Sequence, residues 1–130
     1  MNQSLPQDVL DQIAREILHF DNAPTAFWGA WKRGIQIAGV EWFGDSTHEE
    51  MQQAKTKWEL RPNVLRLNDA LGVLSGRQRM FLSAMVSFYN ASEGGAMLKR
   101  CQFEGLADLG GLDLERRKVI ADLVLHYDGW

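Results

Sequence analysis

Cysteine is almost absent from the sequence, because Cys101 is the only one among 130 residues. A lone cysteine forms no internal disulfide, which excludes the disulfide-rich scaffolds of small secreted proteins. A chain of this length buries roughly two-thirds of its unfolded surface, so its core needs no covalent staple. The N-terminus has neither a basic start nor an apolar stretch, which indicates no secretory signal. We therefore expect a cytoplasmic protein.

Long apolar runs and a basic excess are missing as well. The run Met80-Phe81-Leu82 is far too short to cross a bilayer, so we expect no membrane association. Lysine and arginine number 14 against 17 aspartate and glutamate, which gives a net charge of −3. Because phosphate neutralisation needs a large basic excess, this balance argues against dominant, sequence-independent binding to nucleic acid.

Motifs that carry chemistry are lacking too. The sequence has no P-loop, no G-x-S-x-G and no G-x-G-x-x-G, and none of its three histidines has the partner that H-E-x-x-H requires. The carboxylates beside His48 are better explained by helix capping and by the helix dipole. We predict no catalytic residue, no metal and no cofactor, hence no enzyme. A small enzyme that uses His48, Glu49 or Cys101 is the least favoured alternative.

Helical periodicity is the main signal that the sequence does contain. A first helix is expected from about Leu5 to Phe20, with Ser4 and Gln7 at capping-box spacing. Its apolar side chains recur every three or four residues and form one stripe: Val9, Ile13, Ile17 and Phe20. The segment Asp21-Asn22-Ala23-Pro24 is predicted to end this helix.

The segment from Thr25 to Phe43 admits two interpretations. Its aromatic and aliphatic residues recur at helical spacing, but each of its three interior glycines costs a helix about 1 kcal/mol relative to alanine. The alternative is a hairpin in which 35–37 turns at Ala38-Gly39 into 40–42. A lone hairpin is marginal without further strands. We therefore favour a helix that is bent or broken near Gly39.

The rest of the chain predicts a continuing series of helices with short connections. The pairs Gly94-Gly95 and Gly110-Gly111 are interpreted as breaks between helices. The expected elements run from Thr47 to about Leu60, from Val64 to Gly72, from Gly76 to Tyr89, through Met97 to Cys101, through Leu106 to Leu109, and from Leu114 to Tyr127. The prediction is one all-α domain over residues 1–130, an irregular or orthogonal bundle of about six or seven helices.

An excess of tryptophan suggests a binding surface. The chain has five, and Trp28 lies at the margin of the apolar face of its segment, beside Lys32 and Arg33. Aromatic side chains with arginine are enriched at binding hot spots. A tryptophan at position 130 must either dock on its own domain or project into a partner. Trp28, Lys32, Arg33 and Trp130 are therefore the candidate partner-binding residues, although most of the aromatic rings are expected to be core.

A second candidate is a helix-turn-helix-like segment at 106–127. Its turn would be 106–113, and the following helix begins with Arg116-Arg117-Lys118, where a recognition helix presents its base-contacting end. Against it, Arg117 occupies a position where that motif uses a buried aliphatic side chain. The alternative without DNA binding is a helical hairpin whose charged face is solvated.

These observations favour a non-enzymatic helical module for protein interaction or regulation, with a protein partner or a second copy of itself in a homodimer. The alternative is a DNA-associated regulator that uses 106–127. The composition is typical of a small bacterial or phage accessory protein.

Overall fold

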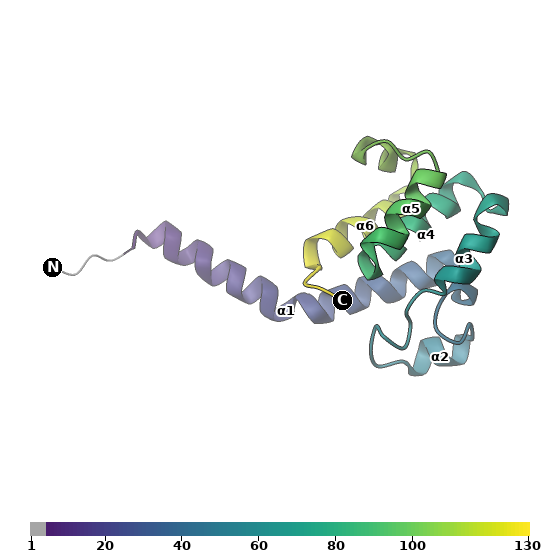
Figure 1. The fold of residues 1–130 in the computed structure, drawn as a ribbon. Coiled ribbons are helices and arrows are strands. Elements are labelled where there is room, and N and C mark those ends of the chain that lie inside the picture. Colours follow the sequence, from purple (N-terminus) through teal and green to yellow (C-terminus); the bar gives the residue numbers. More distant parts are fainter. Residues whose placement is uncertain (1–4) are drawn as a thin grey trace.

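A computed structural model describes residues 5–130 and confirms the all-α fold (Figure 1). The only β contact in the described part of the chain is an isolated antiparallel bridge between Phe43 and Pro62. The α-helices are α1 (Gln7–Ala38), α2 (His48–Gln53), α3 (Val64–Ala70), α4 (Gly76–Tyr89), α5 (Ala91–Arg100) and α6 (Leu114–His126). The 3-10 helices are η1 (Val40–Trp42), η2 (Leu71–Val73) and η3 (Leu106–Gly111).

The first two expected helices are one, so the predicted break at Asp21–Pro24 is wrong. Helix α1 runs through Pro24 without ending. Proline lacks the N–H that would bind the carbonyl of Phe20 and its ring crowds that turn, which bends a helix without stopping it where the flanking turns are held. Figure 1 shows α1 bending where its projecting part meets the bundle. Ser4, the expected cap, lies outside the described residues.

The hairpin alternative for the segment 35–42 is excluded. Helix α1 continues to Ala38 and stops at Gly39, whose φ of 111° lies in a region that favours glycine. The chain then makes η1, which places Trp42 in the core. The expected interruption near Gly39 is thereby confirmed.

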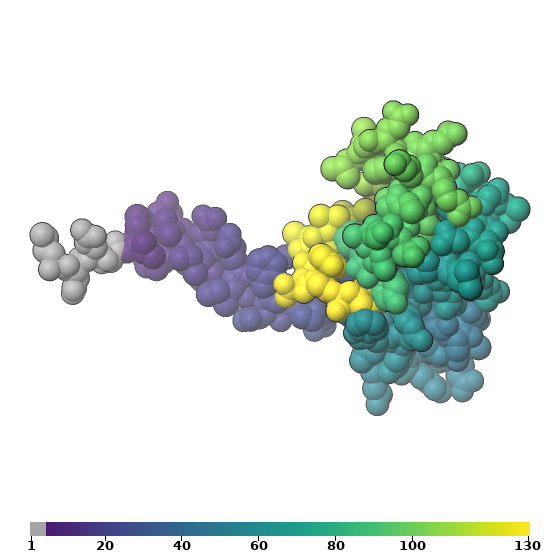
Figure 2. Space-filling model, viewed as in Figure 1, coloured from purple at the N-terminus to yellow at the C-terminus, as the bar shows by residue number. Residues whose placement is uncertain are grey.

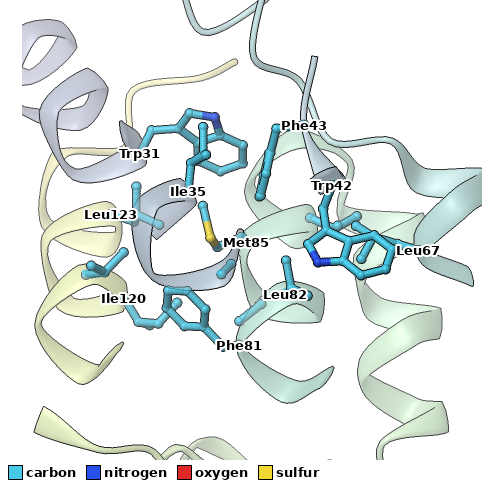
Figure 3. Packing of buried hydrophobic residues seen from close by; sticks show 14 of the residues in the cluster. Trp31, Ile35, Trp42, Phe43, Leu67, Phe81, Leu82, Met85, Ile120 and Leu123 are labelled. Atoms are coloured by element: carbon cyan, nitrogen blue, oxygen red, sulfur yellow. The ribbon is translucent and has the colours of Figure 1, made fainter. Parts of the chain in front are cut away.

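The core surrounds the C-terminal half of α1. Trp31 is fully buried, and its indole Nε1 donates to the carbonyl oxygen of Leu60 over 3.0 Å. Figure 3 shows Trp31 and Ile35 of α1 meeting Met85 of α4 and Leu123 of α6. Six successive residues of α4, 81–86, are buried, as its nearly all-apolar circumference predicts.

Helix α5 lies against α4, and here a second prediction is corrected. Gly94 and Gly95 do not end a helix, because α5 begins at Ala91 and continues to Arg100. Asn90 caps it by accepting the N–H of Glu93. Gly94 is buried beside the backbone of Ser87, where a Cβ would find no room. The glycine therefore serves the close approach of two helices.

Helix α2 is shorter than expected and ends at Gln53, not near Leu60. One local and one long-range hydrogen bond hold the following segment out of helical geometry. The N–H of Lys55 donates to the Glu59 carboxylate, and the N–H of Gly44 donates to the carbonyl of Arg61. The side chain of Trp58 in this segment is 54% exposed.

Candidate functional site

The N-terminal part of α1 leaves the bundle and projects into solvent. Figure 2 shows it as a narrow extension from a broad body. We call residues 7–20 the arm. Every described residue from Leu5 to Leu18 is exposed except Val9, which is half-buried.

The exposed side chains of the arm include a row of large apolar groups. Leu10, Ile13, Ile17 and Phe20 are each between 42% and 59% exposed. Their spacing is three, four and three residues, which is the spacing of a coiled-coil seam. We call these four residues the seam. A row of exposed apolar groups on an unsupported helix is a surface suited to a partner.

The base of the arm is anchored on the C-terminal end of α6. The imidazole Nε2 of His19 lies 2.8 Å from the carbonyl oxygen of Leu125, and its ring stacks on that of His126 at 5.0 Å between centroids. Beyond this point α1 continues into the core through Ala23 and Phe27, both buried. The arm is therefore a direct continuation of a fixed core helix.

The predicted aromatic site is not assembled. Trp28 is half-buried, and the ammonium group of Lys32 lies over its ring at 5.1 Å from the centroid. Arg33 forms an ion pair with Asp122 of α6. The ring of Trp130 lies against that of Phe27, at 6.1 Å between centroids. The most exposed tryptophan is Trp58, which was not among the candidate residues.

Trp130 docks on its own domain. Its ring lies 4.7 Å from that of Trp31 and 5.2 Å from that of Tyr89, measured between centroids. The ammonium group of Lys57 lies over the indole at 5.1 Å and donates to the carbonyl of Gly129 over 2.6 Å. Burial lowers the pKa of Lys57, and the nearby Asp128 carboxylate opposes that shift.

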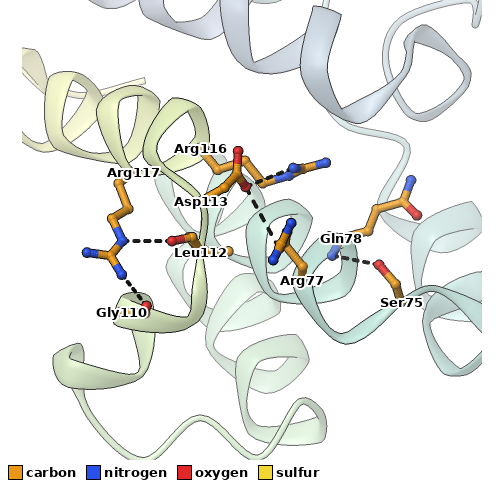
Figure 4. Close-up of polar contacts among 8 residues, drawn as sticks. All are labelled: Ser75, Arg77, Gln78, Gly110, Leu112, Asp113, Arg116 and Arg117. Atoms are coloured by element: carbon orange, nitrogen blue, oxygen red, sulfur yellow. Dashed lines mark hydrogen bonds and ion pairs between the residues drawn. The ribbon is translucent and has the colours of Figure 1, made fainter.

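The three basic residues at the start of α6 are engaged in local contacts (Figure 4). Arg117 donates hydrogen bonds to the carbonyls of Leu112 and Gly110, and these bonds connect the end of η3 to α6. Arg116 forms an ion pair with Asp113, with 2.9 Å between Nη1 and Oδ1, and its side chain is only 20% exposed. The Nζ of Lys118 lies 3.6 Å from the carboxylate of Glu115. The Arg116 hydrogen bond lowers the pKa of Asp113.

The segment before α6 is a 3-10 helix, η3, in place of the first α-helix that a helix-turn-helix requires. Arg116 is thus largely buried, whereas Arg117 and Lys118 are exposed but already engaged in contacts with the protein. These contacts do not favour the nucleic-acid hypothesis.

The residues considered for chemistry are not gathered in one place. Glu49 and Cys101 line two different concavities. Cys101 is half-buried, and its Sγ lies 3.5 Å from the Oγ of the buried Ser83. Within residues 5–130, no group of three or more His, Cys, Asp and Glu side chains is arranged to hold a metal ion. None of the described helices has the length and apolar character needed to span a membrane.

Sequence reasoning found an apolar stripe on the first helix, but with Val9 in place of Leu10, and did not predict that it is exposed. Ile13, Ile17 and Phe20 belong to both sets, and the additional signal was the spacing of Leu10 to Ile13. That spacing suits a buried face and a coiled-coil seam equally. Comparison of the chain with protein-family models, curated proteins and solved structures found no match.

Proposed function

We propose that this protein is a non-enzymatic interaction module whose arm pairs with the arm of a second copy, antiparallel, to form a homodimer. The observation that carries the proposal is the exposed seam on a helix without a neighbour. An isolated helix of about 15 residues is only marginally stable in water. Covering its apolar face against another helix stabilises both.

The seam is self-complementary when two arms run in opposite directions. Its three-four-three spacing is symmetric about Arg15, so a two-fold axis there places Leu10 opposite the partner's Phe20 and Ile13 opposite the partner's Ile17. Each layer then joins an a and a d position, as antiparallel coiled coils do. The same patch serves both copies, as a two-fold interface requires.

The charges beside the seam favour the antiparallel pairing. In a parallel, in-register pair Glu16 would face Asp21 of the other copy on both sides of the interface, which gives two repulsive contacts. In the antiparallel pair Asp21 faces Gln7, an amide donor. One like-charge contact remains, between the two copies of Glu16 near the axis. Opposed helix dipoles also favour this orientation.

The seam is tested by placing a charge in it. Ile13→Glu together with Ile17→Glu is expected to weaken self-association by at least about a hundredfold, because carboxylates without partners would enter an apolar interface. The matched control is Leu18→Glu, since Leu18 is 63% exposed on the arm but lies off the seam. Sedimentation equilibrium of the full chain over a range of concentrations measures the effect.

The wild type and the Leu18→Glu control should both show the dimer mass. Glu16→Gln should tighten the dimer about twofold to threefold by removing the one like-charge contact. A wild type that stays monomeric at every concentration would rule out pairing of the arms. Equal dimerisation of the seam variant would place the interface elsewhere on the molecule.

A further inference from the structure

A concavity between α4, α5 and η3 has an unusual charge. It has a volume of about 380 Å³, and its lining includes Arg77, Arg79 and Arg100 but no acidic residue. The whole chain carries a net charge of −3, so this is a local positive excess against an acidic background. Arg100 comes from the end of α5 and the other two from the start of α4. Folding alone brings these three arginines to the lining of one concavity.

The carboxylate of Asp113 does not neutralise the positive charge of this concavity. Asp113 lies 3.9 Å from Nε of Arg77, but its closer partner is Arg116 at 2.9 Å (Figure 4). Among the described residues, Arg79 and Arg100 form no ion pair. Arg100 binds only the carbonyl and the side-chain oxygen of Asn68, through Nη1. Two guanidinium groups therefore keep unused donors.

Two further observations point to an anion in this place. The Nε atom of Arg79 is buried and has no acceptor within the described part of the chain, which is costly unless a ligand supplies one. The backbone N–H groups of Gly76 and Arg77 in the first turn of α4 likewise have no acceptor in the described structure. The side chain of Ser75 caps this helix by accepting the N–H of Gln78 and leaves these two N–H groups free. Gly76 has open space above its Cα.

We infer that this concavity binds a phosphate group, either as free phosphate or as a phosphomonoester of a small molecule. A phosphate dianion accepts several charge-assisted hydrogen bonds at once, which matches the unused guanidinium donors of Arg79 and Arg100 beside free backbone donors. The volume admits a small organic remainder beside the phosphate. Met80 and Leu112 supply an apolar wall for it. The site is built from other residues than the arm, so it does not depend on the proposed dimer.

Phosphate binding is measured by titrating the full chain and following the backbone amide signals in ¹H–¹⁵N NMR spectra. Inorganic phosphate should give saturable shifts at 76–79 and 100–102, whereas sodium chloride at equal ionic strength should not. Arg79→Gln and Arg100→Gln should each weaken binding about tenfold, since each removes one charge-assisted contact. Arg15→Gln is the control, because it removes the same charge from the arm.

A second titration with phenyl phosphate distinguishes the two sources of the phosphate. Equal or weaker affinity for phenyl phosphate shows that the phosphate alone is recognised, and tighter binding shows that the apolar wall contributes. Thermal melting of each variant confirms that it is folded. Shifts that do not saturate, or that persist unchanged in folded Arg79→Gln and Arg100→Gln, would overturn the inference.

Discussion

Gly94→Ala is expected to lower the free energy of unfolding by about 3 kcal/mol. An added Cβ at this position would overlap the backbone N and Cα of Ser87 on α4. Backbone atoms cannot move aside as the end of a flexible side chain can, so α5 would have to shift away from α4. These two helices form the most extensive helix pair of the fold, and their separation would loosen the packing around Met97.

The adjacent glycine provides the control. Gly95 is exposed in the same helix and has no atom near its added Cβ. Gly95→Ala should raise the free energy of unfolding by up to about 1 kcal/mol, because alanine loses less backbone entropy in a helix than glycine does. Urea unfolding followed by circular dichroism measures both variants. Changes of the same sign would contradict the close contact between α4 and α5.

Trp130→Ala is expected to cost about 2 to 3 kcal/mol, close to the lower end of the range for large aromatic truncations. The indole ring is in contact distance of four other aromatic rings, and Lys57 lies over its face. The ring is only partly buried, and its Nε1 is buried without an acceptor among the described residues. Both facts keep the expected loss below that of a fully satisfied core tryptophan.

Trp58→Ala serves as the comparison for this substitution. It removes the same ring from a position that is 54% exposed, so the expected loss is below about 1 kcal/mol. Thermal and urea unfolding of the two variants give the difference. If Trp130→Ala were as mild as Trp58→Ala, the last residues would not be docked on the rings of Trp31 and Tyr89.

The helices with complete local signals could be predicted from the sequence. Helix α4 was bounded correctly because Ser75 caps its start and its apolar residues cover most of its circumference. The start of α6 was found at Leu114 after Asp113. In both cases the deciding information lies within one or two turns of the element itself.

The errors in the fold share one cause, which is that the same residue serves different purposes in different tertiary surroundings. Pro24 breaks an isolated helix, yet here the turns on both sides are held, and α1 only bends. Gly94 resembles a helix terminator, but it is needed where two backbones meet. The segment after α2 is held by a hydrogen bond from the N–H of Gly44 to the carbonyl of Arg61, a long-range contact that no local pattern encodes.

The candidate sites were less predictable than the fold. The seam was visible as a stripe, but its exposure follows from the length of α1 beyond the bundle, which the expected break had concealed. The arginine-lined concavity had no sequence signal, because the residues between Arg79 and Arg100 make up most of α4 and nearly all of α5. Trp28, Lys32 and Arg33 were chosen for residue type, and contacts within the protein already engage Lys32 and Arg33.

The uninterrupted course of α1 has a thermodynamic consequence. The same hydrogen-bonded helix carries the seam at one end and Trp31 and Ile35 at the other. In the proposed dimer, association through the seam is linked to the folding equilibrium of the body by mass action. The midpoint of thermal unfolding should then rise as the protein becomes more concentrated, although Trp31 and Ile35 are fully buried within one copy.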